Sequence, residues 1–335
     1  MEAQSSSVDQ PTLIPEFNNN AELHDRYIYA LASTSSSIIS SGKGGSIQMW
    51  SKSTLQPLCN PLSYHQGTVT ALGVSETAGL VFSGDTKGHL AVWSLASGQL
   101  IQGIAQAHDD TVLKLAVSGD GEYILSTSRD RSVKVWHRNA GASDRRIEFE
   151  LKAELAGHQG AVLSALVTSD CKRAVSISGD KVLKIWNLET SQTEKTFRLA
   201  SGVGKLQFIE GERKMLAACS DSRVRIYSLE NGEEEACLNG HTNVVKAAHM
   251  IPGINTRASG ETIISASYDG TVRMWKRGGE GQGKWRTVRI LSFKHAIGEP
   301  DFNPQSGRIF DMVVDEKEEY VYACGQSSRI VRWHL

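Results

Sequence analysis

The sequence predicts an all-β fold built from seven repeats, and three features of the chain predict it. Residues 126–136 recur in recognisable form as residues 176–186 and 265–275. Apolar and polar side chains alternate with a period of two, as in residues 111–117, which is the spacing of strands with one buried face. Gly-Asp, Asp-Gly and Asn-Gly pairs separate such segments, as tight hairpins require. The repeats are therefore expected to be antiparallel sheets.

Each repeat ends in an aromatic residue, and successive ends are 41 to 58 residues apart. Most of these steps lie near the roughly 40–45 residues that four short strands per repeat occupy. Seven repeats of four strands would therefore fill the chain. The aromatic ends are Trp50, Trp93, Trp136, Trp186, Tyr227, Trp275 and Trp333.

The composition fits a globular fold with a sizeable apolar core, and the chain has almost no net charge. Of 335 residues, 40% are hydrophobic and 22% charged, and 36 basic against 37 acidic residues leave a net charge of -1. No global field would draw the protein to nucleic acid or acidic lipid, so any basic site must be local.

The N-terminal segment and the cysteines bear on the compartment. Residues 1–11 are polar and Ser-rich, without the basic and apolar regions of a secretory signal, and we expect a flexible tail. The five cysteines are scattered and form no CxxC pair, which argues against a disulfide framework and a thiolate zinc site. We expect a cytoplasmic or nuclear protein.

A histidine usually opens each repeat, and three repeats carry a His, a Ser, an Asp and a Trp at matching offsets. This set resembles the buried, hydrogen-bonded tetrad of WD-repeat β-propellers. The resemblance covers about residues 12–335 and implies a single seven-bladed β-propeller of four-stranded antiparallel blades. The tetrads are His108, Ser126, Asp130 and Trp136, then His158, Ser176, Asp180 and Trp186, then His241, Ser265, Asp269 and Trp275.

The other four repeats depart from this pattern. Gly44 and Lys87 stand in place of the turn Asp in repeats one and two, and Ser327 does so in repeat seven. Repeat five has Leu199 and Tyr227 in place of the His and the Trp. We expect these blades to be held mainly by packing.

Repeat seven lacks an outermost strand of its own, because the chain ends two residues after Trp333. An unpaired edge would result. Residues 12–17 precede the first repeat and are expected to supply the missing strand, as in the family that the chain resembles. The N-terminal strand would then close the ring and remove the free edge.

The repeated Ser, His and Asp do not predict catalysis. A triad needs these residue types, but an active site occurs once, whereas this set recurs with the period of the fold. Hydrogen bonding that satisfies buried polar groups explains the recurrence, so we predict no catalytic residue.

No nucleotide, metal or other cofactor is predicted. Residues 278–284 match GxxxxGK, but Trp285 follows instead of Ser or Thr, and strands are expected on both sides instead of a strand and a helix. The remaining histidines show no short spacing that would place two imidazoles on one metal. They are His89, His137, His249 and His334.

Two loops after third strands are rich in basic residues and would lie on the bottom face. Contacts with RNA or lipid phosphates there are one interpretation. Acidic neighbours, Asp144 and Glu280, favour a solvated surface instead. The basic residues are Arg138, Arg145 and Arg146 in one loop and Lys276, Arg277, Lys284 and Arg286 in the other.

The family resemblance implies three top-face positions per blade: three and five residues after the turn His, and one before the turn Asp. Blades six, seven and one become neighbours on closure and supply aromatic and basic residues there. Blades four and five supply almost none. The alignment of repeat seven rests on Ile309, and a slip of one residue would bury its aromatic. The predicted partner-binding residues are Tyr27, Tyr29, Lys43, Lys246, Tyr268, Arg308 and Phe310 around the seam, and Arg129 on blade three.

These features predict a non-enzymatic scaffold or adaptor, a subunit of a larger complex that binds proteins or peptides on its top face. An acidic or phosphorylated peptide with a hydrophobic anchor would suit the seam residues. One alternative is a substrate receptor of a ubiquitin ligase, although the Trp-Asp-x-Arg signature is absent. Another is an enzyme with a central-channel active site, which needs convergent groups from several blades. None is evident beyond the tetrads, and no small-molecule substrate is predicted.

Overall fold

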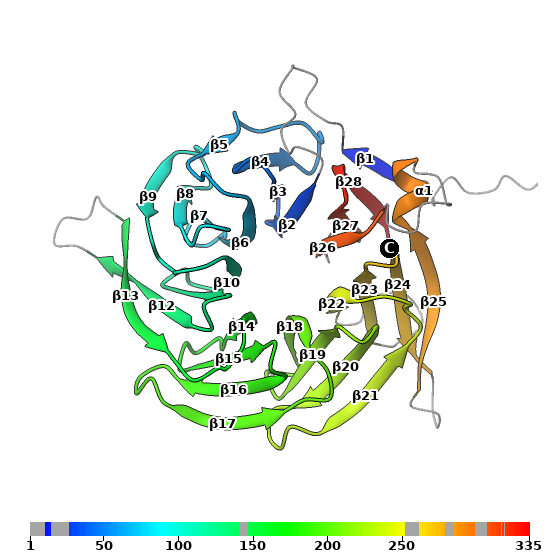
Figure 1. The fold of residues 1–335 in the computed structure, drawn as a ribbon. Coiled ribbons are helices and arrows are strands. Elements are labelled where there is room, and N and C mark those ends of the chain that lie inside the picture. Colours follow the sequence, from blue (N-terminus) through cyan, green and yellow to red (C-terminus); the bar gives the residue numbers. More distant parts are fainter. Residues whose placement is uncertain are drawn as a thin grey trace, which may run out of the picture.

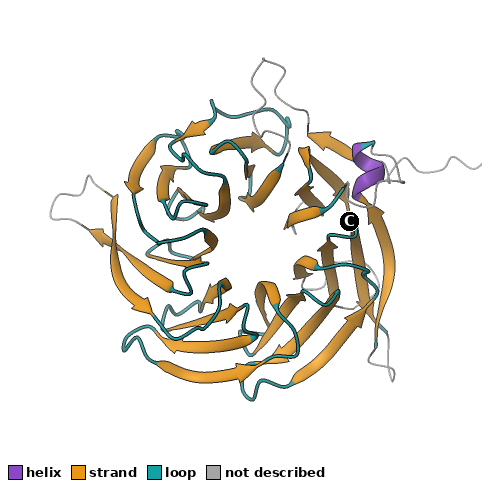
Figure 2. Cartoon of the chain, in the orientation of Figure 1, coloured by secondary structure: helices purple, strands orange, loops and turns teal. Residues whose placement is uncertain are grey.

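The computed structural model describes residues 11–14, 27–140, 147–251, 261–278, 284–298, 307–315, 317 and 319–335. Seven four-stranded antiparallel sheets surround a central opening (Figure 1). Figure 2 shows that strands and short connections make up nearly all of the drawn ribbon. The predicted all-β, seven-bladed propeller is therefore confirmed.

The strands follow one order in each blade, from the innermost strand to the outermost. Blade one consists of β2 (Ile28–Ser33), β3 (Ser37–Gly42), β4 (Ser46–Ser51) and β5 (Leu62–Ser63), blade two of β6 (Val69–Ser75), β7 (Leu80–Asp85), β8 (Leu90–Ser94) and β9 (Leu100–Ile104), and blade three of β10 (Val112–Val117), β11 (Tyr123–Ser128), β12 (Val133–Ala140) and β13 (Ile147–Leu155). Blade four consists of β14 (Val162–Val167), β15 (Arg173–Ser178), β16 (Val182–Asn187) and β17 (Thr193–Arg198), and blade five of β18 (Val203–Ile209), β19 (Lys214–Cys219), β20 (Arg223–Ser228) and β21 (Glu234–Asn239). Blade six consists of β22 (Val245–Ile251), β23 (Thr262–Ser267), β24 (Thr271–Arg277) and β25 (Trp285–Ser292), and blade seven of β26 (Ile309–Asp315), β27 (Tyr320–Gly325), β28 (Ser327–His334) and β1 (Thr12–Ile14).

The N-terminal strand closes the ring as the sequence predicts. Strand β1 pairs antiparallel with β28, with Leu13 opposite Val331. Residues 15–17 of the predicted closing segment lie outside the described residues. Two polar contacts also join blades seven and one: the ion pair of Lys52 with Asp315, and a hydrogen bond from the Leu31 N–H to Asp311. Pairing and buried polar contacts therefore both hold the closure seam.

Apolar side chains fill the space between neighbouring blades. Phe82 of blade two meets Phe149 of blade three edge to face, with ring centroids 5.3 Å apart, and both are buried. Between blades six and seven, Phe293 of the short helix α1 (Phe293–Ile297) is buried against Trp333, whose ring centroid lies 6.4 Å away. Packing between blades is thus continuous around the ring.

A β-bulge near the start of the innermost strand recurs in all seven blades. The second residue of that strand is left out of the pairing register, and such a bulge redirects its side chain. This residue is also the second of the three top-face positions predicted for each blade. The bulged residues are Tyr29, Thr70, Leu113, Leu163, Gly204, Lys246 and Phe310.

Candidate functional site

The predicted tetrads of blades three and six are complete. In blade three, His108 Nε2 lies 2.6 Å from the Ser126 hydroxyl and Nδ1 lies 2.8 Å from the Asp130 carboxylate, while Trp136 donates to Ser126 at 2.9 Å. Burial lowers the pKa of His108, and the opposing effect of Asp130 is smaller. A buried imidazole held on both nitrogens is a structural element. Blade six repeats the arrangement with His241, Ser265, Asp269 and Trp275.

The tetrad of blade four is only partly formed. His158 Nε2 lies 2.7 Å from Ser176, and Trp186 donates to the same hydroxyl at 2.7 Å. The Nδ1 atom of His158, however, has no hydrogen-bond partner within the described part of the chain. Asp180 instead accepts bonds from the backbone N–H groups of Gln159 and Val182. The predicted bond between His158 and Asp180 is therefore missing.

One side chain next to the tetrad differs between blade four and blades three and six. In blade three the Ser132 hydroxyl lies 3.1 Å from the His Nδ1 and donates to the Asp, and Thr271 occupies this place in blade six. Val182 stands there in blade four and has no hydroxyl. Burial lowers the pKa of His158 to about 4, outweighing the attraction of Asp180.

Blade two contains a partly formed tetrad that the sequence pattern missed. His65 Nε2 lies 2.7 Å from Ser83, and Trp93 donates to Ser83 at 2.9 Å. His65 Nδ1 lies 3.2 Å from the Asp85 carboxylate, close enough for an electrostatic contact but without a hydrogen bond between the two atoms. Lys87 does occupy the turn position, but Asp85, two residues earlier, supplies the carboxylate. Polar contacts therefore add to the packing that was expected to hold this blade. Burial acts to raise the pKa of Asp85, but the neighbouring His65 and hydrogen bonds from the backbone outweigh it and lower the pKa to about 2.

Blade five replaces the missing His and Trp with a buried arginine. Arg225 is 2% exposed and donates two parallel bonds to Asp221, at 2.7 and 2.6 Å, and one to Glu234 at 2.8 Å. A bidentate ion pair from the buried Arg225 therefore adds to the packing that was expected to hold this blade. The sequence contained a signal for this arginine, because a basic residue also stands two positions before the terminal aromatic in blades three, four and six. These residues are Lys134, Lys184 and Arg273.

The remaining departures are simpler. In blade one, Trp50 donates to Ser40 at 2.8 Å, while its opening residue, His24, lies outside the described residues. In blade seven, Ala323 stands where the tetrad Ser lies in the complete blades, so Trp333 has no such hydroxyl.

One backbone hydrogen bond fixes the top-face positions in every blade. The residue before the turn Asp donates its N–H to the carbonyl of the residue three after the turn His, as from Tyr268 to Val244 at 2.9 Å. Gln326 donates to Arg308 in the same way at 2.8 Å, so the alignment of repeat seven is correct. The other pairs are Lys43 with Tyr27, Thr86 with Thr68, Arg129 with Thr111, Gly179 with Ala161 and Ser220 with Gly202.

Four of the predicted aromatic residues form one cluster on this face, drawn from blades one, six and seven. Tyr29 stacks on Phe310 with ring centroids 5.1 Å apart and an interplanar angle of 6°. Tyr268 and Tyr27 meet Phe310 edge-on, at 5.7 and 6.1 Å. Burial, and next the neighbouring Tyr27, raise the pKa of Tyr29. The cluster therefore spans the closure seam.

Two predicted cations flank the aromatic cluster. Lys246 Nζ lies 5.3 Å and Arg308 Cζ 5.7 Å from the ring centroid of Tyr268. The Arg308 Nε atom is buried and has no hydrogen-bond partner among the described residues. Lys43 is exposed beside the cluster on blade one. We call Tyr27, Tyr29, Lys43, Lys246, Tyr268, Arg308 and Phe310 the crescent; Arg129 is exposed on blade three, apart from it.

Charged residues from three non-adjacent blades also meet at the central opening. Asp311 on β26 is 2% exposed. Its carboxylate oxygens lie 2.6 Å from Lys205 Nζ of β18 and 3.5 Å from Lys114 Nζ of β10. Burial acts to raise the pKa of Asp311, but the two lysines outweigh it and hold the pKa well below its usual range. The expectation that no groups converge beyond the tetrads is therefore wrong.

The sequence contained one signal for this convergence. Lys114, Lys205 and Asp311 each follow the bulged residue directly and are the first residue to resume the pairing register. Their alignment was thus available, but the contact depends on how the ring curves. We call these three residues the channel cluster.

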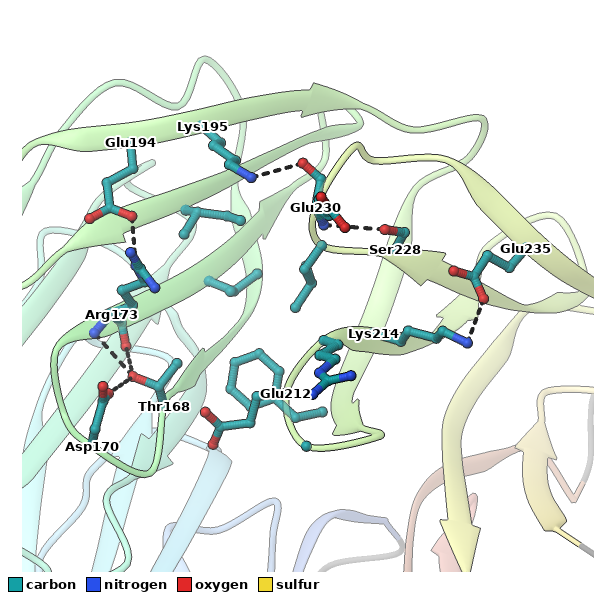
Figure 3. Close-up of a pocket in the computed structure, with 16 residues that line it drawn as sticks. Thr168, Asp170, Arg173, Glu194, Lys195, Glu212, Lys214, Ser228, Glu230 and Glu235 are labelled. Carbon is teal, nitrogen blue, oxygen red and sulfur yellow. Dashed lines mark hydrogen bonds and ion pairs between the residues drawn. The ribbon is translucent and has the colours of Figure 1, made fainter.

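A pocket of ≈ 500 Å³ lies between blades four and five (Figure 3). Its charged side chains largely neutralise one another: Arg173 pairs with Glu194 at 2.7 Å, and Lys214 with Glu235 at 2.8 Å. This pattern of paired charges is that of a solvated groove. The apolar lining residues are Val175, Ile185, Phe208 and Leu229.

The GxxxxGK segment joins two strands, as expected. The Gly278 N–H donates to the Lys284 carbonyl at 3.0 Å, and Arg277 of β24 pairs with Trp285 of β25. Of the basic loop residues, Arg138 pairs with Glu122 and Arg277 with Glu261, at 3.3 and 3.5 Å. The loop residues 144–146 and 280 lie outside the described residues.

Among the described residues, no three His, Cys, Asp or Glu side chains are grouped as metal ligands would be. The helix in this part of the chain, α1, is 5 residues long, and no described helix is long and apolar enough to cross a bilayer.

Comparison with known proteins agrees with the geometry. The family model "WD domain, G-beta repeat" matches residues 99–137, 149–187 and 232–276. These segments contain the repeats with the full sequence tetrad.

Curated relatives match over short segments. The protein transport protein SEC13 of Cryptococcus neoformans is 41% identical over 76 residues, which are 21% of this chain and 21% of that protein. The SIR4-interacting protein SIF2 of Saccharomyces cerevisiae is 28% identical over 87 residues, 26% of this chain and 15% of its own length. The match thus spans about a fifth or less of each relative.

A solved structure matches over nearly the whole chain. The WD40 β-propeller domain of Doa1 superposes with a TM-score of 0.74 over 97% of this chain and 96% of that one, at 18% identity. That likeness shows the fold, and the family model and relatives supply the repeat. The chain therefore carries WD repeats in blades three, four and six, and as a whole it has the fold of a WD40 β-propeller.

Proposed function

We propose that this chain is a non-enzymatic scaffold or adaptor that binds partner proteins through the crescent. The observation that carries the proposal is the contact of Tyr29, Phe310 and Tyr268 across the seam, with Lys246 and Arg308 beside them. Binding energy at protein interfaces is concentrated in a few such side chains, among which Tyr and Arg are enriched.

The partner proposed is a peptide segment with a hydrophobic anchor and an acidic or phosphorylated residue. Half-buried rings offer apolar surface to the anchor, and Arg308 and Lys246 offer positive charge to the anion. The opposite side of the same face offers few side chains for contact, because blades four and five carry Ala161, Gly179 and Gly202 there. This asymmetry favours one binding region on the face.

The relatives support a role within assemblies. SIF2 is named for its interaction with SIR4, and SEC13 is named as a transport protein. We extend only the general role, binding to other proteins, to this chain. A cytoplasmic or nuclear location remains part of the proposal.

Quantitative affinity purification tests the proposal. Truncating a central aromatic anchor typically costs about 2 kcal/mol of binding, roughly thirtyfold in Kd. We expect Tyr268→Ala and Phe310→Ala to lose the partners that wild type retains, and the purified partner to bind these variants at least tenfold more weakly by calorimetry. Leu163→Ala on blade four and Ser220→Ala on blade five are matched controls.

Two outcomes would count against the crescent. One is unchanged affinity in folded Tyr268→Ala and Phe310→Ala proteins. The other is loss of binding on changing Arg138 or Arg277, which would move the working surface to the bottom face.

A further inference from the structure

The channel cluster and the crescent are adjacent in the sequence of β26. Phe310 and Asp311 are consecutive on β26, so the aromatic platform and the carboxylate are one residue apart, about 3.3 Å along the strand. Lys114 and Lys205 occupy the corresponding position in blades three and five. Because these blades are not adjacent to blade seven, the contacts cross the centre of the ring of innermost strands (Figure 1).

Positive charge exceeds negative charge in this cluster. Two ammonium groups face one carboxylate, and the Asp311 oxygens also accept the N–H groups of Leu31 and Met312. The carboxylate is thus fully engaged. Lys114, by contrast, makes one long contact of 3.5 Å with it, and an ammonium group has three donors.

The lysines remain accessible where the carboxylate is not. The side chains of Lys114 and Lys205 are 20% and 23% exposed, against 2% for Asp311. Burial lowers the pKa of Lys114; Asp311 opposes this, and the charges of Lys205 and Lys246 add to the lowering. Lys246, a crescent residue, therefore extends the positive field from the cluster to the top face.

We propose that the channel cluster accepts one anionic side chain of the partner peptide, a carboxylate or a phosphate, which takes hydrogen bonds from Lys114 and Lys205 while its neighbour packs on the crescent. This inference rests on the proposed function and names the residues that select the anion. Asp311 holds the lysines in place and competes with the ligand for them. Charge-assisted bonds in so enclosed a site are stronger than those at an exposed rim.

Opposite effects of two substitutions distinguish this role from a purely structural one. Lys114→Met keeps the apolar stem and removes a charge, so anion affinity should fall. Asp311→Asn keeps an acceptor for the Leu31 N–H and removes the competing charge, so anion affinity should rise. If the cluster only braced the ring, both substitutions would weaken binding through lost stability.

The probes are fluorescein-labelled pentapeptides Gly-Phe-X-Phe-Gly, where X is Glu, Gln, phosphoserine or Ser, measured by fluorescence anisotropy. We expect wild type to prefer Glu over Gln, and phosphoserine over Ser, by about tenfold at low salt and less at high salt. Lys114→Met should reduce both preferences to about threefold or less, and Asp311→Asn should increase them. Lys172→Met, an exposed residue of blade four outside the cluster, controls for net charge.

Each outcome decides a separate point. Equal binding of Glu and Gln peptides to wild type would overturn the channel proposal and leave the crescent standing, provided that Tyr268→Ala weakens both. Binding of neither peptide by wild type at about 1 mM would overturn both. A thermal melt checks folding, and Lys205→Met replaces any variant that fails to fold, with the same loss of preference expected.

Discussion

The carboxylate of Asp85 gives the sharpest stability prediction. Asp85→Ala removes the buried carboxylate that lies 3.2 Å from His65 Nδ1 and that accepts the N–H groups of Lys87 and His89. Water can reach residue 87, which is exposed, so the main losses are the electrostatic contact with the buried imidazole and the charge-assisted bond from the His89 N–H. A buried unsatisfied group costs about 1–3 kcal/mol, and we expect about 3 kcal/mol in total. The melting temperature should fall by about 5–10 °C.

Asp180→Ala is the matched comparison, because Asp180 occupies the tetrad position of blade four but makes no hydrogen bond to His158. Asp180 binds only backbone N–H groups next to solvent, so its loss should cost about 1 kcal/mol. Guanidinium denaturation of both variants, with equal m-values as the two-state check, measures the difference. The reasoning is refuted if Asp85→Ala destabilises the protein no more than Asp180→Ala.

Two further predictions concern pH and ring closure. The pKa of His158 is about 4 in the fold against 6.5 ordinarily, so its contribution to stability is complete above pH 6.5 and is lost as the pH falls towards 4. In denaturation at stepped pH, the free energy of unfolding of His158→Gln should therefore change less between pH 6.5 and 4 than that of wild type. An unchanged dependence on pH would contradict the assignment. Deletion of residues 1–20 removes β1 and exposes the edge of β28, so the melting temperature should drop sharply or the protein become insoluble, whereas deletion of residues 1–9 should be tolerated. Equal melting temperatures for the two deletions would contradict closure by β1.

Features that depend on the repeat could be predicted from the sequence. The strand order, the closing strand, the tetrads of blades three and six, and the crescent all follow from residues at fixed offsets. They do so because each blade repeats the same backbone hydrogen bond, as between Tyr268 and Val244 or Gln326 and Arg308. The same bond fixed Ile309 as a buried residue and Phe310 as the bulged one.

The identity of the residue that pairs with a buried polar group could not be predicted from the sequence. The carboxylate beside a buried imidazole can come from Asp85, two residues early, and in blade five Arg225 and Asp221 form a different pair. In blade four the offset is kept and the bond is still absent. The channel cluster arises only when the ring brings blades three, five and seven together, and no offset along the chain encodes that distance.

The central claim, that partners bind at the crescent, is tested most directly by site-specific photo-crosslinking. A benzophenone amino acid would replace Lys43, an exposed residue of the crescent, Leu163 on the opposite side of the same face, or Lys172 at the other end of blade four. The account predicts strong crosslinks to the main partner from position 43, weak ones from 163 and none from 172. Strong crosslinks from position 172, with none from position 43, would contradict it.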